Sequence, residues 1–259
     1  MAEALFIRDG DRYRPTRLTE GPWSPDAQHG GPPAALLAGA IEKMPAEMEM
    51  VVARVSVELL RPVPIAPLRL TSELVRPGRK VQLVAATLAH EDQEVARALG
   101  LRIRRADLDL PFDPPDYEFP PPNDGRPATF FERAGAFANE AMEIRMIEGD
   151  ISEPGPGKAW LRLWVPVVEG EDTTGVERVA AAADFGNGIS NLAGSERAWV
   201  FINPDLVIHL ARPPIGKWVY MDSLTQLHPT GTGLASSVLA DQAGLLGTAA
   251  QSLFVEPMR

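Results

Sequence analysis

Apolar residues are spaced in two different ways along the first half of the chain. From Ala34 to Ile41 nearly every position is apolar, so the sequence predicts a buried helix over about 32–44. Pro32 fits its start, because the N–H that proline lacks would be unpaired in a first helical turn. Runs rich in apolar residues follow, separated by turn signals. They predict strands over 51–60, 68–75, 81–89 and 95–103.

The second half repeats this order. Thr174 and Glu177 form a capping box, and apolar residues then recur on one helical face, which predicts a helix over about 175–186. Further strands are predicted over 198–202 or on to 210, and over 218–227, 234–240 and 245–255. One helix followed by several long antiparallel strands, twice over, indicates an α+β fold, a double hotdog. Each of its two tandem repeats has an antiparallel sheet wrapped around a long helix.

A proline-rich segment separates the two halves. Its prolines exclude a helix or a central strand over 111–128 and predict a stiff linker there. The N-terminal repeat would then span 1–110 and the C-terminal repeat 129–259. A long surface loop within one domain is the alternative, although such loops are uncommon.

An internal sequence repeat supports this division. An offset of 151 residues, held without a gap over 54–105, aligns eight identical residues, where chance gives about three. The pairs include Leu59 with Leu210 and Arg61 with Arg212. We therefore interpret the two halves as a duplication.

Composition and charge narrow the class of protein. The 259 residues carry a formal net charge of −10, which leaves no basic surface for nucleic acid at the level of the whole chain. Because the chain has no cysteine and only four histidines, none spaced i, i+4, we expect no metal site, and we expect no cofactor. No uncharged apolar run approaches the roughly 18 residues of a membrane helix. The acidic N-terminus does not resemble a signal peptide, so we expect a cytoplasmic protein with no membrane partner.

Several short motifs lie on the predicted elements. They are His29-Gly30-Gly31, Glu58-Leu59-Leu60-Arg61-Pro62, Arg76-Pro77-Gly78-Arg79, Ala183-Asp184-Phe185, Ala211-Arg212-Pro213 and a final-strand Gln251. In this order, along nearly the whole chain, they resemble the acyl-CoA thioesterase II (TesB-like) family of double-hotdog proteins. The resemblance implies an acyl-CoA substrate that is hydrolysed, without a metal, to free CoA and a carboxylic acid.

The family's catalytic residues are an Asp on the second central helix, a Thr on the following strand and a Gln on the last strand. By position, the resemblance assigns these roles to Asp184, Asn203 and Gln251. Asn203 stands where the family has Thr, and Pro32 follows the Gly-Gly pair where the family often has Gln.

The same residues suit thioester hydrolysis on chemical grounds. The N–H groups at a helix N-terminus can polarise the carbonyl, and Gly30 and Gly31 would let the thioester approach them closely. Asp184, among apolar neighbours, would act as general base on a water or as nucleophile. Gln251 and Asn203 carry amides that could position the water and bind Asp184.

Each of these residues also has a structural interpretation. The Gly-Gly pair could simply allow a tight helix start, and Asp184 could cap the loop that follows its helix. Gln251 could face solvent, and Asn203 could be a turn residue. For His29, packing or capping beside the helix start is a stronger expectation than contact with the substrate.

The Gly-Gly helix start occurs only in the first repeat, and a carboxylate at the position of Asp184 occurs only in the second. Gly39, eight residues after Gly31, carries no carboxylate, and the second helix starts without a Gly-Gly pair. We therefore expect one composite site between the repeats. Two other functions stay open. A hotdog enoyl-CoA hydratase would favour an Asp–His pair, and no His follows Asp184 closely in the sequence. A non-catalytic acyl-binding or acyl-CoA-binding module would need neither the Asp nor the His.

The strand predicted over 81–89 is apolar on both faces except at Gln82 and Thr87. An antiparallel strand of this kind needs cover on both sides. We therefore expect a homo-oligomer, in which another copy of the chain supplies part of that cover.

Overall fold

The computed structural model describes residues 3–111, 117–131, 134–192 and 199–258. Its helices are α1 (Gly31–Glu42), α2 (Gly175–Ala183) and α3 (Gly186–Ile189), with 3₁₀ turns at Arg17–Thr19 and Pro122–Asp124 and a π-helical turn at Phe137–Ala141. The strands of the first half are β1 (Phe6–Asp9), β2 (Arg12–Pro15), β3 (Met50–Leu59), β4 (Leu68–Arg76), β5 (Val81–His90) and β6 (Gln93–Arg104). Those of the second half are β7 (Arg126–Ala128), β8 (Met142–Glu148), β9 (Gly157–Leu163), β10 (Trp199–Ile202), β11 (Asp205–Leu210), β12 (Trp218–His228), β13 (Thr232–Asp241) and β14 (Gly244–Pro257).

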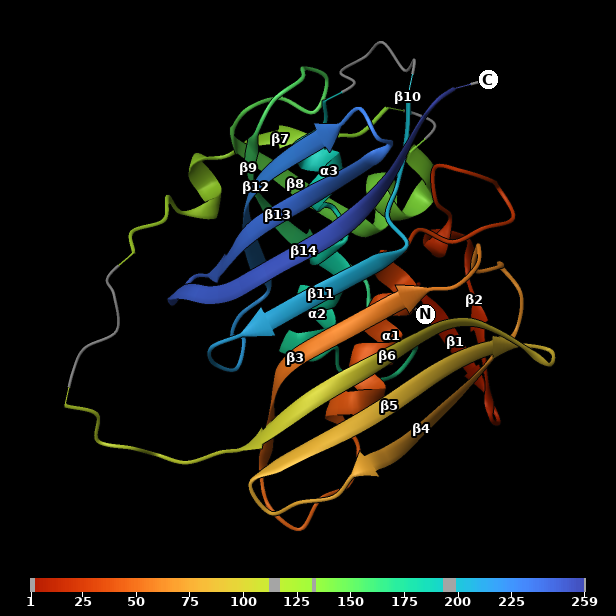
Figure 1. The fold of residues 1–259 in the computed structure, drawn as a ribbon, viewed down its shortest axis with the longest axis vertical. Coiled ribbons are helices and arrows are strands. Elements are labelled where there is room, and N and C mark those ends of the chain that lie inside the picture. Colours follow the sequence, from red (N-terminus) through yellow and green to blue (C-terminus); the bar gives the residue numbers. More distant parts are fainter. Residues whose placement is uncertain (1–2, 112–116, 132–133, 193–198, 259) are drawn as a thin grey trace.

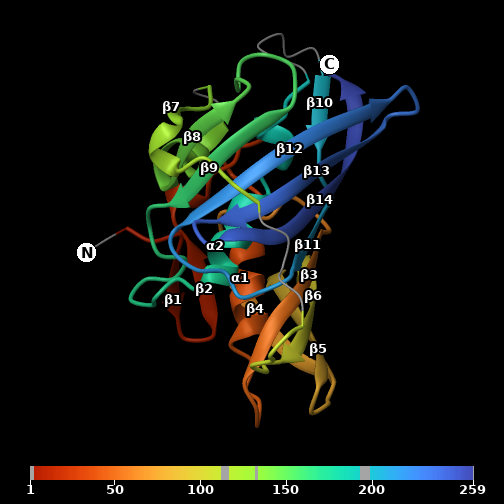
Figure 2. The same cartoon turned by 90° about the vertical axis from the view of Figure 1, so that its left-hand side faces the viewer.

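The strands form one open antiparallel sheet. Their order is β1-β2-β4-β5-β6-β3-β11-β14-β13-β12-β9-β8-β7, and β10 also pairs with β14 (Figure 1). The two halves join edge to edge where β3 pairs with β11. Both central helices lie side by side on one face of this sheet, which curves around them (Figure 2). The double hotdog predicted from the sequence is therefore confirmed.

The offset of 151 residues holds in the sheet as well as in the sequence. The β5–β6 hairpin pairs Val81 with Ile103, and the β13–β14 hairpin pairs Thr232 with Phe254. Both hairpins also shift register at equivalent positions, which are 151 residues apart. The register of the two hairpins confirms the gapless repeat.

The core lies between the two central helices and the sheet. Helix α1 is buried on nearly every side, because the sheet covers one side of it and α2 another. The helices approach closely at Gly39, where a Cβ would lie only 2.1 Å from Glu177 Oε1. Glu177 is itself fixed, because it completes the capping box with Thr174 and accepts a bond from Lys43 at 3.0 Å.

Two predicted elements differ from the structure. The second helix ends at Ala183, with Asp184 as its C-cap, and the chain turns at Phe185 before the short helix α3. The longer extent predicted for the next strand, on to 210, is wrong: β10 ends at Ile202, as the shorter prediction of 198–202 has it, and β11 is a separate strand. Pro204 explains the division, because it lies between them and cannot donate to a ladder.

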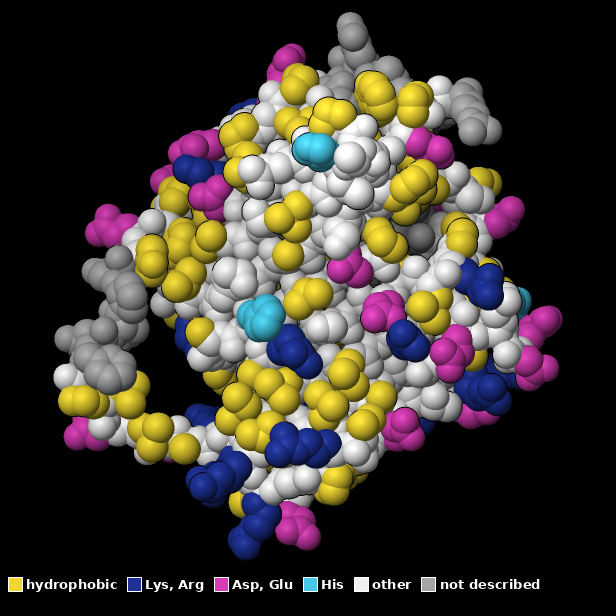
Figure 3. Space-filling model, in the orientation of Figure 1, with side chains coloured by type: hydrophobic (Ala, Val, Ile, Leu, Met, Phe, Trp, Pro, Cys, Tyr) yellow, Lys and Arg dark blue, Asp and Glu magenta, His cyan; other side chains and the backbone are white. Residues whose placement is uncertain are grey.

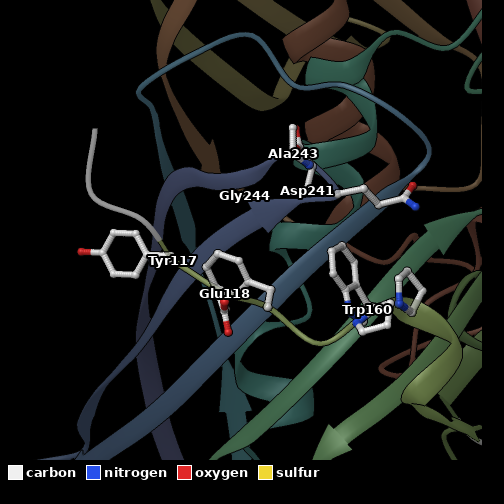
Figure 4. Close-up of a pocket in the computed structure, with 10 residues that line it drawn as sticks. Tyr117, Glu118, Trp160, Asp241, Ala243 and Gly244 are labelled. Atoms are coloured by element: carbon white, nitrogen blue, oxygen red, sulfur yellow. The ribbon is translucent and has the colours of Figure 1, made fainter. Parts of the chain in front are cut away.

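Residues 117–122 of the proline-rich segment lie on the outer face of the second repeat. Phe119 packs on Tyr220 with ring centroids 5.0 Å apart, and the Trp160 indole donates a hydrogen bond to the Pro120 carbonyl at 2.7 Å. A hollow of about 480 Å³ lies beside these contacts. Figure 4 shows residues that line it, among them Trp160. The segment ends in β7, an edge strand that tolerates Pro127. Domain boundaries at 110 and 128 stay a prediction.

None of the helices in the described residues is both long and apolar enough to cross a membrane.

Candidate active site

The end of α2 meets the start of α1. Asp184, the C-cap of α2, is only 7% exposed, and its carboxylate lies directly beside Gly30. A Cβ at position 30 would be 2.6 Å from Asp184 Oδ2, so the carboxylate occupies space that only a glycine leaves free. The structure therefore brings a helix start from the first repeat and a carboxylate from the second into one place.

Two side-chain amides hold the Asp184 carboxylate. Asn203, between β10 and β11, donates Nδ2–H to Oδ1 at 2.7 Å. Gln251, on β14 and 1% exposed, donates Nε2–H to the same oxygen at 3.2 Å and to the Asp184 backbone carbonyl at 3.1 Å. The Oε1 of Gln251 in turn accepts the Asn187 amide at 3.1 Å. Gln251 thus faces the helices rather than solvent and ties Asp184 to the loop after it.

His29 contacts the other carboxylate oxygen. Its Nδ1 lies 2.9 Å from Asp184 Oδ2 and 3.1 Å from the Gly31 amide nitrogen. A single ring nitrogen either donates or accepts, so Nδ1 serves Asp184 when it carries a proton and caps Gly31 when it does not. The ring also packs between Phe137 and Phe185, with centroids 4.9 and 4.8 Å away.

One argument from the sequence is therefore wrong. The absence of a histidine shortly after Asp184 counted against an Asp–His pair, yet the structure contains one, because His29 comes from the other repeat. Antiparallel packing of α1 and α2 supplies this neighbour. The signal available in the sequence was the position of His29 directly before the Gly-Gly helix start.

Among the residues that the structure describes, the start of α1 has one amide without an acceptor, that of Gly30. Gly31 donates to His29 Nδ1, and the two following prolines have no N–H to give. The Gly30 N–H donates to no acceptor in the part of the chain that the structure describes. Gly31 lies against Phe137, whose ring would be 2.7 Å from a Cβ at that position. The two glycines thus differ: Gly31 makes room for packing, and Gly30 presents a donor beside Asp184.

A cavity of about 560 Å³ opens onto this cluster. His29, Gly30, Asp184 and Asn203 all line it. Its other walls come from the loop before α1, the segment after β7, the α2–α3 turn, β10 and the C-terminal end of the described chain. An acyl group could therefore be held next to the carboxylate and the helix N-terminus.

In the first repeat, the residues that match Gln251 and Asn203 carry no polar side chain. At the offset of 151, Gly100 corresponds to Gln251 in the sheet register, and Val52 corresponds to Asn203. Ile41 fills the space above Gly100, where its Cγ2 would be 2.2 Å from a Cβ. The nearby Glu42 is partly buried, and burial raises its pKa. The polar constellation around Asp184 thus has no counterpart at this position.

Comparison with known proteins agrees with the fold and the motifs. Models of the N-terminal and C-terminal domains of acyl-CoA thioesterases match residues 19–103 and 113–255. None of the curated proteins compared with the chain matches its sequence.

Solved structures share the fold at low identity. A hot dog fold protein of unknown function from Alicyclobacillus acidocaldarius is 16% identical with a TM-score of 0.75, over 98% of this chain and 96% of that one. The tesB protein of Mycobacterium avium subs paratuberculosis is 17% identical with a TM-score of 0.71, over 97% and 96%. Acyl-CoA thioesterase II TesB2 of Mycobacterium marinum is 15% identical with a TM-score of 0.65, over 100% and 96%. The two domain matches together span most of the chain and show that it belongs to the family of acyl-CoA thioesterases.

Proposed function

We propose that the chain hydrolyses an acyl-CoA thioester to free CoA and a carboxylic acid, with Asp184 as the base. The observation that carries this proposal is the place of Asp184. Its buried carboxylate is held by two amides and lines a cavity, and it lies beside Gly30, whose N–H has no acceptor among the described residues. A thioester carbonyl seated there would meet a hydrogen-bond donor and a base at once.

The proposed reaction uses each of these groups. The carbonyl oxygen accepts the Gly30 N–H, which stabilises the negative charge that develops when the carbon is attacked. Asp184 takes a proton from water, and the water oxygen bonds to the carbonyl carbon. The C–S bond then breaks, and the sulfur leaves as thiolate. The proton on Asp184 then passes to the sulfur, which gives free CoA and regenerates the carboxylate, and His29 orients Asp184 through Oδ2. Gln251 and Asn203 keep the carboxylate in place.

The decisive test is Asp184→Asn. This change keeps the size of the side chain but removes the base, so thiol release should fall by about 10²–10⁴-fold. Acyl-CoA binding should survive, because the helix start is unchanged and the cavity keeps its shape. Glu177→Gln is the matched control, since Glu177 is also a buried acid of α2 but lies at the other end of the helix. An Asp184→Asn variant that folds and keeps its activity would refute the proposal.

The His29–Asp184 pair makes an enoyl-CoA hydratase the second candidate. A hydratase would add water across the double bond and release no thiol. Crotonyl-CoA therefore separates the two: loss of the enoyl absorbance without free thiol indicates hydration, and free thiol indicates hydrolysis. Binding of acyl-CoA with neither reaction would indicate the non-catalytic module.

A further inference from the structure

The cavity at Asp184 has an unusual wall. Six of its lining residues are Phe or Trp, although aromatic residues make up only 7% of the chain. Among the described residues that line it there is no Leu, Ile or Val. The six aromatic residues are Trp23, Phe130, Phe131, Phe185, Trp199 and Phe201.

These rings are not simply core residues that touch a void. Trp23, Phe131 and Trp199 are 54%, 43% and 48% exposed, and they come from three separate segments of the chain. Large exposed rings that converge on one cavity indicate a binding surface, because single exposed aromatics would otherwise be scattered. Trp23 and Trp199 therefore present aromatic surface to the cavity.

The inner rings connect this wall to the chemistry. Phe130 lies 5.6 Å from Phe185 between centroids, and Phe185 stacks on His29 at 4.8 Å. Gly188 leaves space for Phe130, since a Cβ there would be 3.1 Å from the ring. An acyl group that reaches Asp184 therefore passes along aromatic faces.

We propose that the acyl group of the preferred substrate is aromatic, as in an aryl- or arylalkanoyl-CoA. Aromatic pairs contribute roughly 0.5–1.5 kcal/mol each beyond the area they bury, and an alkyl chain gains only the burial. A flexible chain also loses more conformational entropy when it is fixed between rigid rings. This inference rests on the proposed thioesterase activity.

The experiment compares phenylacetyl-CoA with octanoyl-CoA, which have the same number of acyl carbons. We expect kcat/KM to be at least about tenfold higher for the aromatic substrate, which corresponds to one or two ring contacts. In Phe130→Leu this preference should shrink several-fold, mainly through loss of the aromatic substrate. Phe119→Leu is the matched control, because Phe119 packs on the outer face of the sheet.

The two proposals fail in different ways. If octanoyl-CoA is cleaved as well as or better than phenylacetyl-CoA, the aromatic preference is refuted while the thioesterase stands. If neither releases thiol, the hydrolysis proposal fails for these substrates. Calorimetric Kd values of the two thioesters for the wild-type chain then decide the preference: tighter binding of phenylacetyl-CoA supports it, and equal or weaker binding overturns it.

A second inference concerns the outer face of β5 and β6. Apolar residues lie opposite one another on the side of the hairpin away from α1, in the pairs Val81–Ile103, Leu83–Leu101 and Ala85–Leu99. Figure 3 shows apolar side chains gathered over this part of the sheet, with Lys and Arg along its lower border. No described segment of the chain crosses this patch in Figure 1, in contrast to the outer face of the second repeat.

Opposite charges lie at the two ends of the patch. Exposed basic residues stand at one end of the hairpin, namely Arg76, Arg79, Lys80 and Arg104. Exposed acidic residues stand at its other end, namely Glu91, Asp92 and Glu94. None of these seven forms an ion pair with another residue that the structure describes.

We infer that a second copy of this chain covers the patch around a two-fold axis. Such an interface is self-complementary, because each surface meets the same surface turned around. A rotation axis near the Ala85–Leu99 pair would place the basic end of one copy over the acidic end of the other. The apolar pairs would then be buried between them. This inference does not depend on the proposed function.

Light scattering after size exclusion tests it at micromolar concentration. We expect a dimer or a higher even oligomer for the wild-type chain and a smaller species for Leu101→Asp, with thiol release unchanged. Leu224→Asp is the matched control, since Leu224 is exposed on β12 in the other repeat. Arg79→Glu and Glu91→Arg should each weaken the assembly, and the two changes together should restore it. A monomeric wild-type chain, or an assembly that survives Leu101→Asp, would overturn the inference.

Discussion

Replacement of Gly30 by Ala should displace the Asp184 carboxylate without removing it. The new Cβ would lie 2.6 Å from Oδ2 and 2.9 Å from Oδ1, so the carboxylate must move by roughly 1 Å to reach an ordinary contact. Its bonds to His29 and Asn203, now 2.9 and 2.7 Å long, would be stretched by this movement. A misplacement of about 1 Å can cost about 10²-fold in rate. We therefore expect kcat to fall by about 100-fold.

Stability should change much less than activity in this variant. Gly30 has φ −66° and ψ −25°, which alanine adopts without backbone strain, although alanine is a poorer N-cap than glycine. The weakened hydrogen bonds should cost roughly 1–3 kcal/mol. Thermal unfolding and steady-state thiol release on the same sample separate the two effects.

Gly39→Ala is the control for this prediction. It places a Cβ against another buried carboxylate, Glu177, on the same pair of helices but away from His29 and Asp184. We expect it to lose stability and to keep its activity per folded molecule. If Gly30→Ala stays within about threefold of the wild-type kcat, the close placement of Asp184 is not needed for the reaction, and the argument from geometry fails.

Three further predictions follow from the hydrogen bonds. Gln251→Leu removes the bonds to Asp184 and leaves the Asn187 amide without its acceptor, so we expect a loss of about 2 kcal/mol by urea titration and at least tenfold lower kcat. Asn203→Thr keeps a side-chain donor and should retain most of the activity, whereas Asn203→Leu should lose about tenfold; equal rates would argue against the bond to Asp184. Burial alone would raise the pKa of Asp241, but bonds from Arg212 and two backbone amides outweigh it and lower that pKa. This pair therefore stabilises the fold at neutral pH and is lost as the pH falls through the lowered pKa. Arg212→Met should lower the free energy of unfolding at pH 7 by about 3 kcal/mol and flatten its decline toward acid pH, and an unchanged acid profile would contradict the assignment.

Most of the fold could be predicted because its signals are local. Along the long strands, apolar residues either alternate with polar ones or form continuous runs, and turn residues separate these strands. The capping box marks the start of α2. The matched hairpins β5–β6 and β13–β14 also carry enough identity to align without a gap. In contrast, β1, β2 and β7 are only three or four residues long, too short to show a period. Strand β8 does alternate, with its apolar residues buried, and this signal could have been used.

The site was only partly accessible from the sequence. Asp184 and Gln251 stood out because each interrupts an apolar run, and the Gly-Gly pair marked a helix start. The contact of His29 with Asp184 depends on antiparallel packing of helices from different repeats, which no local pattern encodes. The aromatic wall combines residues from segments on both sides of the chain's midpoint, and each is an ordinary isolated ring until the fold places it.

The apolar packing of Ile41 over Gly100 has an evolutionary consequence. If the two repeats were identical, each would carry every residue of the site, and one could replace the other. With Ile41 and Val52 in the first repeat, that repeat supplies the helix start and His29, and the second repeat supplies the acid and its amides. Reversal would require several simultaneous polar substitutions in a packed core, each destabilising until the others arrive. Because each repeat supplies different residues of the site, neither repeat could be replaced by a copy of the other without loss of the site.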